Sequence, residues 1–259
     1  MQKAHKSLNL RLILLLGTAF LLIVVQALGL FSNLTTPIER LEYSMQDTFV
    51  RLRGVEAVSE EIVIVAIDDA SFQWNGLQWP WPRSYFAEIT DQINAGGGKV
   101  LGMDVLLFEP DEKDPQNDVL FASALSEIPA AVGVIEIRKQ TGSGFETEVL
   151  AQPIPIYLES MDGLGTTGVK RDDDAIVRSV TAYSTYQGTV YPHWAFELAR
   201  LYLNVDSPTF SNTGVEFNGQ RITLNAGYLP VYFAGPAGTY PTYSAADVHD
   251  GITLEQDPD

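Results

Sequence analysis

The sequence predicts an α/β protein with a mostly parallel central sheet, helices on both faces of the sheet, one N-terminal transmembrane helix and a C-terminal β-hairpin. Three observations predict this fold class. Apolar runs at 62–67, 100–108 and 130–135 alternate with segments of helical periodicity, a long apolar run lies at 12–31, and Asn218-Gly219 separates two strand-like segments. Strands that alternate with helices are joined by crossover connections, which favours parallel pairing.

The N-terminal apolar run at 12–31 is interrupted by only one strongly polar side chain, Gln26. A helix of this length extends about 30 Å, the thickness of the hydrocarbon core of a bilayer. Lys3, Lys6 and Arg11 precede the run, so we expect residues 1–11 in the cytoplasm. The prediction is a single-pass protein of the inner membrane with most of the chain in the periplasm or outside the cell. The alternative is a signal peptide cleaved after Val25-Gln26-Ala27, which would export the same part of the chain.

A membrane-proximal helix is expected within residues 33–53, beginning at Thr36-Pro37. Its apolar residues recur at three- and four-residue steps and form one stripe: Ile38, Leu41, Met45, Phe49 and Leu52. The helix is either a stalk that carries movement to the membrane span or a helix packed on the core of its own domain. Residues 54–259 then form the extracytoplasmic domain.

The first half of this domain alternates strands and helices. Ile62–Ile67 is a β-branched run that we expect to be buried on both faces, as in a central strand of a parallel sheet. Pro82 begins a helix that ends at Gly96-Gly97-Gly98, and Asp114-Pro115 begins another. Two further strands are expected at 100–108 and 130–135.

After Arg138 the pattern is less regular. Glycine and proline at 139–155 indicate a long surface excursion. The later elements are a strand within 176–186, a helix that begins at Pro192, a hairpin around Asn218-Gly219 and a strand at 229–233. Asn-Gly accepts positive φ at both turn positions, which favours a tight hairpin.

Charge and composition limit the possible partners. Residues 33–259 hold all 33 Asp and Glu of the chain, which has a net charge of −17. A surface of this sign repels nucleic acid, so we expect no nucleic-acid partner. The chain has no cysteine, which excludes disulfides, cysteine nucleophiles and thiolate metal sites.

Carboxylates follow the first two predicted strands. Asp68 and Asp69 end the first strand, Asp104 lies within the second and Glu109 follows it. Functional groups of a parallel sheet gather at the carboxyl ends of its strands. We expect these residues and Arg83 to form a buried ion-pair network or a ligand-binding site. The alternative is a metal-dependent extracytoplasmic hydrolase that uses Asp68, Asp69 and Asp104.

Other motifs carry weaker predictions. Phe72, Trp74, Trp79 and Trp81 either line a ligand pocket or cover the core. Asp172-Asp173-Asp174 is expected to be a solvated turn, because it lacks the ligand spacing of a calcium loop. The histidines at 5, 193 and 249 lie far apart and indicate no zinc site. We therefore expect no catalytic residue, metal or cofactor.

Several segments of the chain together match the pattern of one sensory family. They are Ile62–Ser71, Trp79-Pro80-Trp81-Pro82-Arg83 and Gly97–Phe108, with weaker similarity at Gly163-Leu164-Gly165, Asp174, Arg178 and Pro192–Ala199. These segments resemble the second type of CHASE domain, the cyclase/histidine-kinase-associated sensory extracellular family. The resemblance implies a bacterial input domain outside the cytoplasmic membrane, whose relatives are coupled to cyclases or kinases. Because relatives continue past Tyr243–Val248 into a final strand, spans and an effector, we expect a fragment or a short form of a receptor.

The functional prediction is a sensory input domain without catalysis of its own. It would detect an unknown small molecule or protein, and pass the signal to a cytoplasmic effector that this chain does not contain. We expect a homodimer, by analogy with other single-span sensors. A third possibility is a purely structural assembly module.

Overall fold

The structure is a computed structural model that describes residues 15–21, 23–24, 37–142 and 145–251. Residues 15–21 and 23–24 are helical, and the rest of the predicted membrane span lies outside the described residues. Within the described ranges, no helix combines the length and the apolar character needed to cross a membrane. The chain divides into two compact units, Met1–Ala57 with Phe233–Pro236 and Val58–Tyr232 with Ala237–Asp259.

The first unit contains α2 (Pro37–Arg53), which has the predicted bounds. Glu39 in its first turn and Arg51 in its last turn both suit the helix dipole. The described residues of its apolar stripe are at least half exposed: Leu41, Met45, Phe49 and Leu52. After the helix, Arg53 pairs with Glu56 at 3.0 Å, and the Glu56 backbone N–H donates to the carbonyl of Ala234.

The second unit holds several small sheets, so the predicted mostly parallel central sheet is wrong. Strand β1 (Ile64–Ala66) pairs in parallel with β14 (Thr242–Ser244), near the other end of the chain, and not with the second predicted strand. The expected burial of Ile62–Ile67 on both faces is wrong, because Ile62 and Val63 lie before β1 and are about half exposed. The second predicted strand shortens to β2 (Leu101–Gly102).

The largest sheet is built around β3 (Ala131–Gly142), which pairs in parallel with β2 and with β5 (Gly163–Thr166). Its far end pairs antiparallel with β4 (Phe145–Ala151), so the surface excursion expected at 139–155 is wrong. Gly142, at the end of β3, pairs with Phe145 at the start of β4, so this segment forms a β-hairpin and not a long loop.

The helices of the second unit follow their local start and stop signals. Asp114 caps α5 (Pro115–Glu127), and α4 (Arg83–Ala95) begins after Pro82 and ends at Gly96, as predicted. The short α3 (Asp69–Asn75), which we did not predict, follows β1 directly. The others are α6 (Pro155–Leu158), α7 (Trp194–Leu203) and α8 (Ala245–His249).

The C-terminal part of the second unit consists of antiparallel pairs. Its strands are β6 (Val169–Arg171), β7 (Val177–Thr181), β8 (Tyr183–Tyr186), β9 (Thr189–Pro192), β10 (Thr209–Ser211), β11 (Gly214–Phe217), β12 (Gln220–Thr223) and β13 (Tyr228–Pro230). The predicted hairpin is confirmed as β11–β12, with Asn218 at φ 48° and Gly219 at φ 71°.

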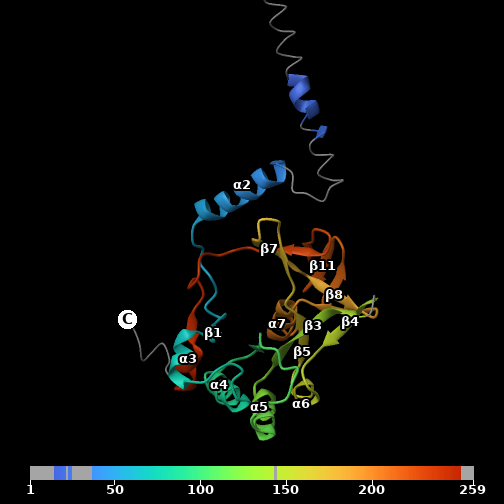
Figure 1. Cartoon of the computed structure of the whole chain (residues 1–259). Coiled ribbons are helices and arrows are strands. Elements are labelled where there is room, and N and C mark those ends of the chain that lie inside the picture. The colour runs from blue at the N-terminus through green and yellow to red at the C-terminus, as the bar shows by residue number, and fades with distance from the viewer. Residues whose placement is uncertain (1–14, 22, 25–36, 143–144, 252–259) are drawn as a thin grey trace, which may run out of the picture. The chain divides into compact units, whose positions relative to one another are not determined.

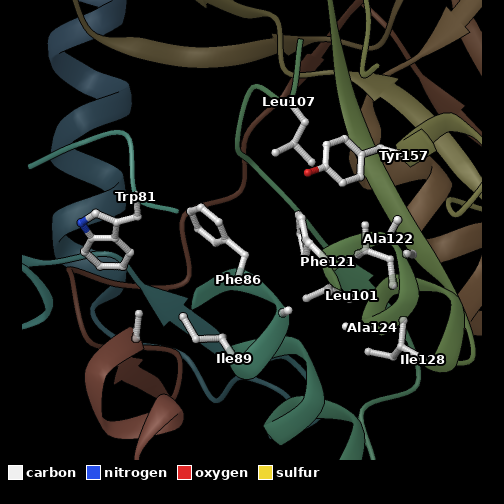
Figure 2. Close-up of a cluster of buried hydrophobic side chains, with 14 residues drawn as sticks. Trp81, Phe86, Ile89, Leu101, Leu107, Phe121, Ala122, Ala124, Ile128 and Tyr157 are labelled. Atoms are coloured by element: carbon white, nitrogen blue, oxygen red, sulfur yellow. The ribbon is translucent and has the colours of Figure 1, made fainter. Parts of the chain in front are cut away.

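The main core of the second unit lies between α4, α5 and the β3 sheet (Figures 1 and 2). Phe121 and Tyr157 are fully buried, and their ring centroids lie 5.3 Å apart. Trp81 and Phe86 extend this row of rings, as Figure 2 shows. A smaller core gathers Ala182, Phe196, Val215 and Leu224 under the antiparallel strands.

Candidate functional site

Asp68, the first of the predicted site residues, caps α3. Its Oδ1 accepts from the backbone N–H of Ser71 at 2.9 Å and from the Ser71 hydroxyl at 2.8 Å. A carboxylate in this position satisfies an N–H that the first helical turn leaves free and also suits the helix dipole. The Asp-x-x-Ser spacing after an apolar strand was a usable signal for this cap.

Ser244 joins Asp68 from the last strand of the unit. Its hydroxyl donates to the same Oδ1 at 2.8 Å. The hydroxyl of Ser71, which is fully buried, lies 2.9 Å from the Ser244 hydroxyl. Both hydroxyls also lie 3.3 Å from the backbone N–H of Ala246, in the first turn of α8. We call Asp68, Ser71 and Ser244 the strand junction, because they connect β1, α3, β14 and α8.

The strand junction requires an ionised carboxylate. The hydrogen bond from the Ser71 backbone is the largest cause that lowers the pKa of Asp68. Burial opposes this effect, and the hydroxyls of Ser244 and Ser71 add to it. All these donors point at Asp68, so a protonated carboxyl would lose much of what holds the junction together.

Arg83, the second central residue of the predicted site, is buried at the start of α4. Its backbone N–H donates to Asp111 Oδ2 at 2.6 Å. Asp111 also accepts from the backbone of Lys113 and Asp114 and from the side chain of Asn117. Burial alone would raise the pKa of Asp111, but these donors outweigh it and leave the pKa lowered.

A second buried carboxylate, Asp118, continues this network. It accepts from the Asp111 backbone N–H and, at 2.5 Å, from the hydroxyl of Tyr157. Burial and the hydrogen bond to Asp118 both raise the pKa of the Tyr157 phenol. Tyr157 therefore stays protonated and acts as a donor that ties α6 to α5.

The predicted carboxylates do not form an ion-pair network with Arg83 among the described residues. The Arg83 side-chain nitrogens Nε and Nη1 are buried without a hydrogen-bond partner, and its guanidinium lies 5.7 Å from the Phe86 ring. Asp69, Asp104 and Glu109 are all exposed. The fold separates them because β1 and β2 belong to different sheets.

Asp104 affects a histidine instead of an arginine. His193 is buried and caps α7, with Nδ1 accepting from the Ala195 backbone N–H at 3.3 Å. Burial lowers the pKa of His193, and the Asp104 carboxylate partly offsets this shift. His193 is therefore a structural cap in its neutral form.

The four aromatic residues of the predicted pocket have different environments. Trp81 is 3% exposed and packs on Phe72, with ring centroids 5.2 Å apart, so both belong to the core. Trp74 and Trp79 are 41% and 47% exposed. Trp74 lies against Tyr85 and against His249, which the sequence analysis did not select.

A groove of about 460 Å³ runs along the exposed side of α4 and α5. Its acidic residues are Glu88, Asp91 and Glu127. Partial desolvation is the largest cause that raises the pKa of Asp91, and the carboxylates of Glu127 and Glu88 raise it further. The groove is thus a region of negative potential.

The aspartates at 172–174 are held by an arginine. Arg178 pairs with Asp172 at 3.0 Å and with Asp174 at 2.7 Å. The Asp172 side chain is only 7% exposed, so the predicted solvated turn is in part a buried ion pair. The side-chain hydrogen bond from Arg178 is the largest cause that lowers the pKa of Asp174.

The described residues contain no group of three or more acidic or histidine side chains that could hold a metal ion. The residues that matter most for the observed geometry and that the sequence analysis missed are Ser71, Ser244, Asp111, Asp118, Tyr157 and His249. Among the contacts of these residues, only the helix caps could be predicted from neighbouring residues in the sequence. The others depend on contacts between segments that lie far apart in the chain.

Comparison with known protein families gives a match over most of the chain. The family model of the CHASE2 domain matches residues 18–258, which is nearly the whole chain. Neither the curated proteins nor the solved structures gave a match. Because the match covers far more than half of the residues, the chain belongs to the CHASE2 family of extracellular sensory domains.

Proposed function

We propose that this protein is the extracytoplasmic input domain of a bacterial transmembrane receptor. The observation that carries the proposal is the family match over residues 18–258. The apolar run at 12–31, with Lys3, Lys6 and Arg11 before it, supports an anchor in the inner membrane with residues 1–11 in the cytoplasm.

The proposed mechanism is a bias between two states of the domain. A stimulus, either a small molecule or a protein, shifts the equilibrium if it binds one state more tightly. The parallel pairing of β1 with β14 supports this proposal, since a displacement of the C-terminal strand acts directly on the strand that follows α2. A homodimer would convert the shift into movement of one copy against the other, and a cytoplasmic cyclase or kinase would receive the signal.

The half-exposed rings of Trp74 and Trp79 are our candidates for contact with the stimulus. Tryptophan fluorescence of the full chain should change when the stimulus is added. Replacement of Trp79 by Phe should reduce that change, while replacement of the buried Trp81 should chiefly lower stability.

Protease protection tests the proposed location. Protease added to intact spheroplasts should cut the second unit, whose loops are exposed, and should spare an epitope tag placed before Lys3. Lysed cells should lose both. Protection of the second unit in intact spheroplasts would reject the proposal.

A further inference from the structure

Helix α8 is held at its two ends by different kinds of contact. At its start, Ser244 belongs to the strand junction and donates to Asp68. The lowered pKa of Asp68 keeps this end unchanged throughout the neutral range. At its end, His249 and Asp250 contact α3 and α4. The C-terminal end is therefore the one whose contacts depend on a histidine.

Carboxylates face both ring nitrogens of His249. Nε2 lies 2.6 Å from Glu88 Oε2 on α4, and Nδ1 lies 3.2 Å from Asp250 Oδ1. The contact with Glu88 lacks hydrogen-bond geometry, and Nε2 is shielded from solvent. The His249 side chain is only 17% exposed, while the Glu88 and Asp250 side chains are 59% and 44% exposed.

Two aromatic rings lie against the imidazole, one tilted and one stacked. The centroid of Trp74 on α3 lies 4.4 Å from that of His249, and the stacked ring of Tyr85 on α4 lies at 5.6 Å. The indole Nε1 of Trp74 also donates to Asp250 Oδ2 at 3.0 Å. The stacked Tyr85 ring and both carboxylates attract a positive charge at this position.

A neutral imidazole cannot satisfy these surroundings. It carries one N–H, so one of its two nitrogens presents a lone pair to a carboxylate. The imidazolium donates from both nitrogens and removes this conflict. Protonation should therefore strengthen the contact of α8 with α4.

The charged groups around His249 have the same sign. Helix α4 carries Glu88 and, one turn further, Asp91. Glu127 of α5 also faces Asp91. Helix α3 carries Asp69, and α8 adds Asp247 and is followed by Asp250. Strands β1 and β14 contribute no charged residue. Across the described ranges, no lysine or arginine pairs with Glu88 or Asp250.

We propose that His249 is a proton-linked latch on α8. In its protonated form it holds the end of α8 on α3 and α4, and in its neutral form it releases that end while the strand junction keeps the start of α8 in place. The ligand of this device is the proton, so the domain would sense extracytoplasmic pH. This role in signalling rests on the proposed sensory function, but the latch itself does not.

The sign of the effect follows from linkage. Because the imidazolium can donate to both carboxylates and the neutral ring to only one, the proposed latch docks α8 as the pH falls and releases it as the pH rises. Histidine changes its charge between about pH 5 and 8, which is the window to examine.

Hydrogen exchange of the full chain in detergent micelles measures the latch. The probe is the proton alone, supplied as buffers from pH 5.5 to 8. The readout is the protection factor of a peptide spanning Tyr243–Gly251, which includes the N–H groups of Asp250 and Gly251 that bond to α8 carbonyls. We expect protection to fall about threefold from the lowest to the highest pH, as for one or two partly exposed ion pairs.

Three variants separate the latch from general effects of pH. His249→Gln and Glu88→Gln should both remove the pH dependence of this peptide. His193→Asn, which keeps a cap for α7, should retain it. If His249→Gln does not fold, the NMR titration of the His249 ring in the unmodified chain and in Glu88→Gln replaces it, with a shift of the midpoint to lower pH expected in the variant.

Coincident pH profiles of the unmodified chain and His249→Gln would overturn the latch, and so would an unchanged titration of His249 in Glu88→Gln. Neither result depends on the membrane topology. If the latch responds but protease shows the domain in the cytoplasm, the sensory proposal fails while the latch stands.

Discussion

Asp68 was selected from the sequence as a possible ion-pair or metal ligand, and the fold uses it as a helix cap. Its three donors come from Ser71 and Ser244, and the second of these lies 176 residues away. An acidic residue after a strand can serve a site or a cap, and only the distant partner decides between the two. The Asp-x-x-Ser pattern predicts the local half of the arrangement.

The cap leads to a prediction about stability. Asp68→Ala should lower the free energy of unfolding by about 1–2 kcal/mol, because α3 loses its capping acceptor and Ser244 loses its partner. Urea unfolding at pH 7 measures the effect. Asp69→Ala, at an exposed position in the same turn, should change stability by less than about 0.5 kcal/mol.

The pH dependence of this difference has a definite sign. The pKa of Asp68 is lowered in the folded state, so its contribution is complete at neutral pH and declines as the pH falls below about 4. The unmodified chain and Asp68→Ala should therefore converge in stability towards pH 3. A difference that grows on acidification would contradict the assignment.

Tyr157 carries a second prediction at the scale of one residue. Tyr157→Phe should destabilise the protein by about 1–3 kcal/mol, because the buried Asp118 loses its hydroxyl donor. Thermal or urea unfolding measures the loss. Tyr202→Phe, on the exposed side of α7, is the matched control with an expected change below about 0.5 kcal/mol. Equal stability of both variants would show that the Asp118 contact is unimportant.

At the scale of the element, helices with their own start and stop signals were predicted correctly. The prolines at 82 and 115 and the glycine at 96 set the bounds of α4 and α5. The pairing of strands was predicted poorly, because a short β-branched run does not encode its partner. Ile64–Ala66 was a strand as expected, but its partner β14 follows from packing across the whole unit.

Gly102, the last residue of β2, packs closely against α7. A Cβ at this position would lie 2.4 Å from the Trp194 ring, so the strand passes directly against α7. Gly102→Ala should cost about 1–3 kcal/mol through overpacking. Gly96→Ala is the control, since its Cβ would meet only ordinary contacts at 3.4 Å. Unchanged unfolding of Gly102→Ala would mean that β2 and α7 are not in close contact.

At the scale of the whole molecule, the family was recognisable from segments that are contiguous in sequence, such as 62–71, 79–83 and 97–108. The candidate site was not recognisable in this way, because Ser244 and His249 contact their partners only where the chain returns to α3 and α4. Single residues of ordinary type at the end of a chain carry no local mark of such a role. The aspartates and tryptophans were selected as candidate site residues because they cluster in the sequence.

The central claim is that the folded body lies outside the cytoplasm, and the chain offers a clean way to test it. It contains no cysteine, so single cysteines introduced as Ser207→Cys and Ser7→Cys are the only thiols of the protein. A membrane-impermeant maleimide on spheroplasts should label Ser207→Cys and should label Ser7→Cys only after lysis. Labelling of Ser207→Cys that requires lysis would contradict the account.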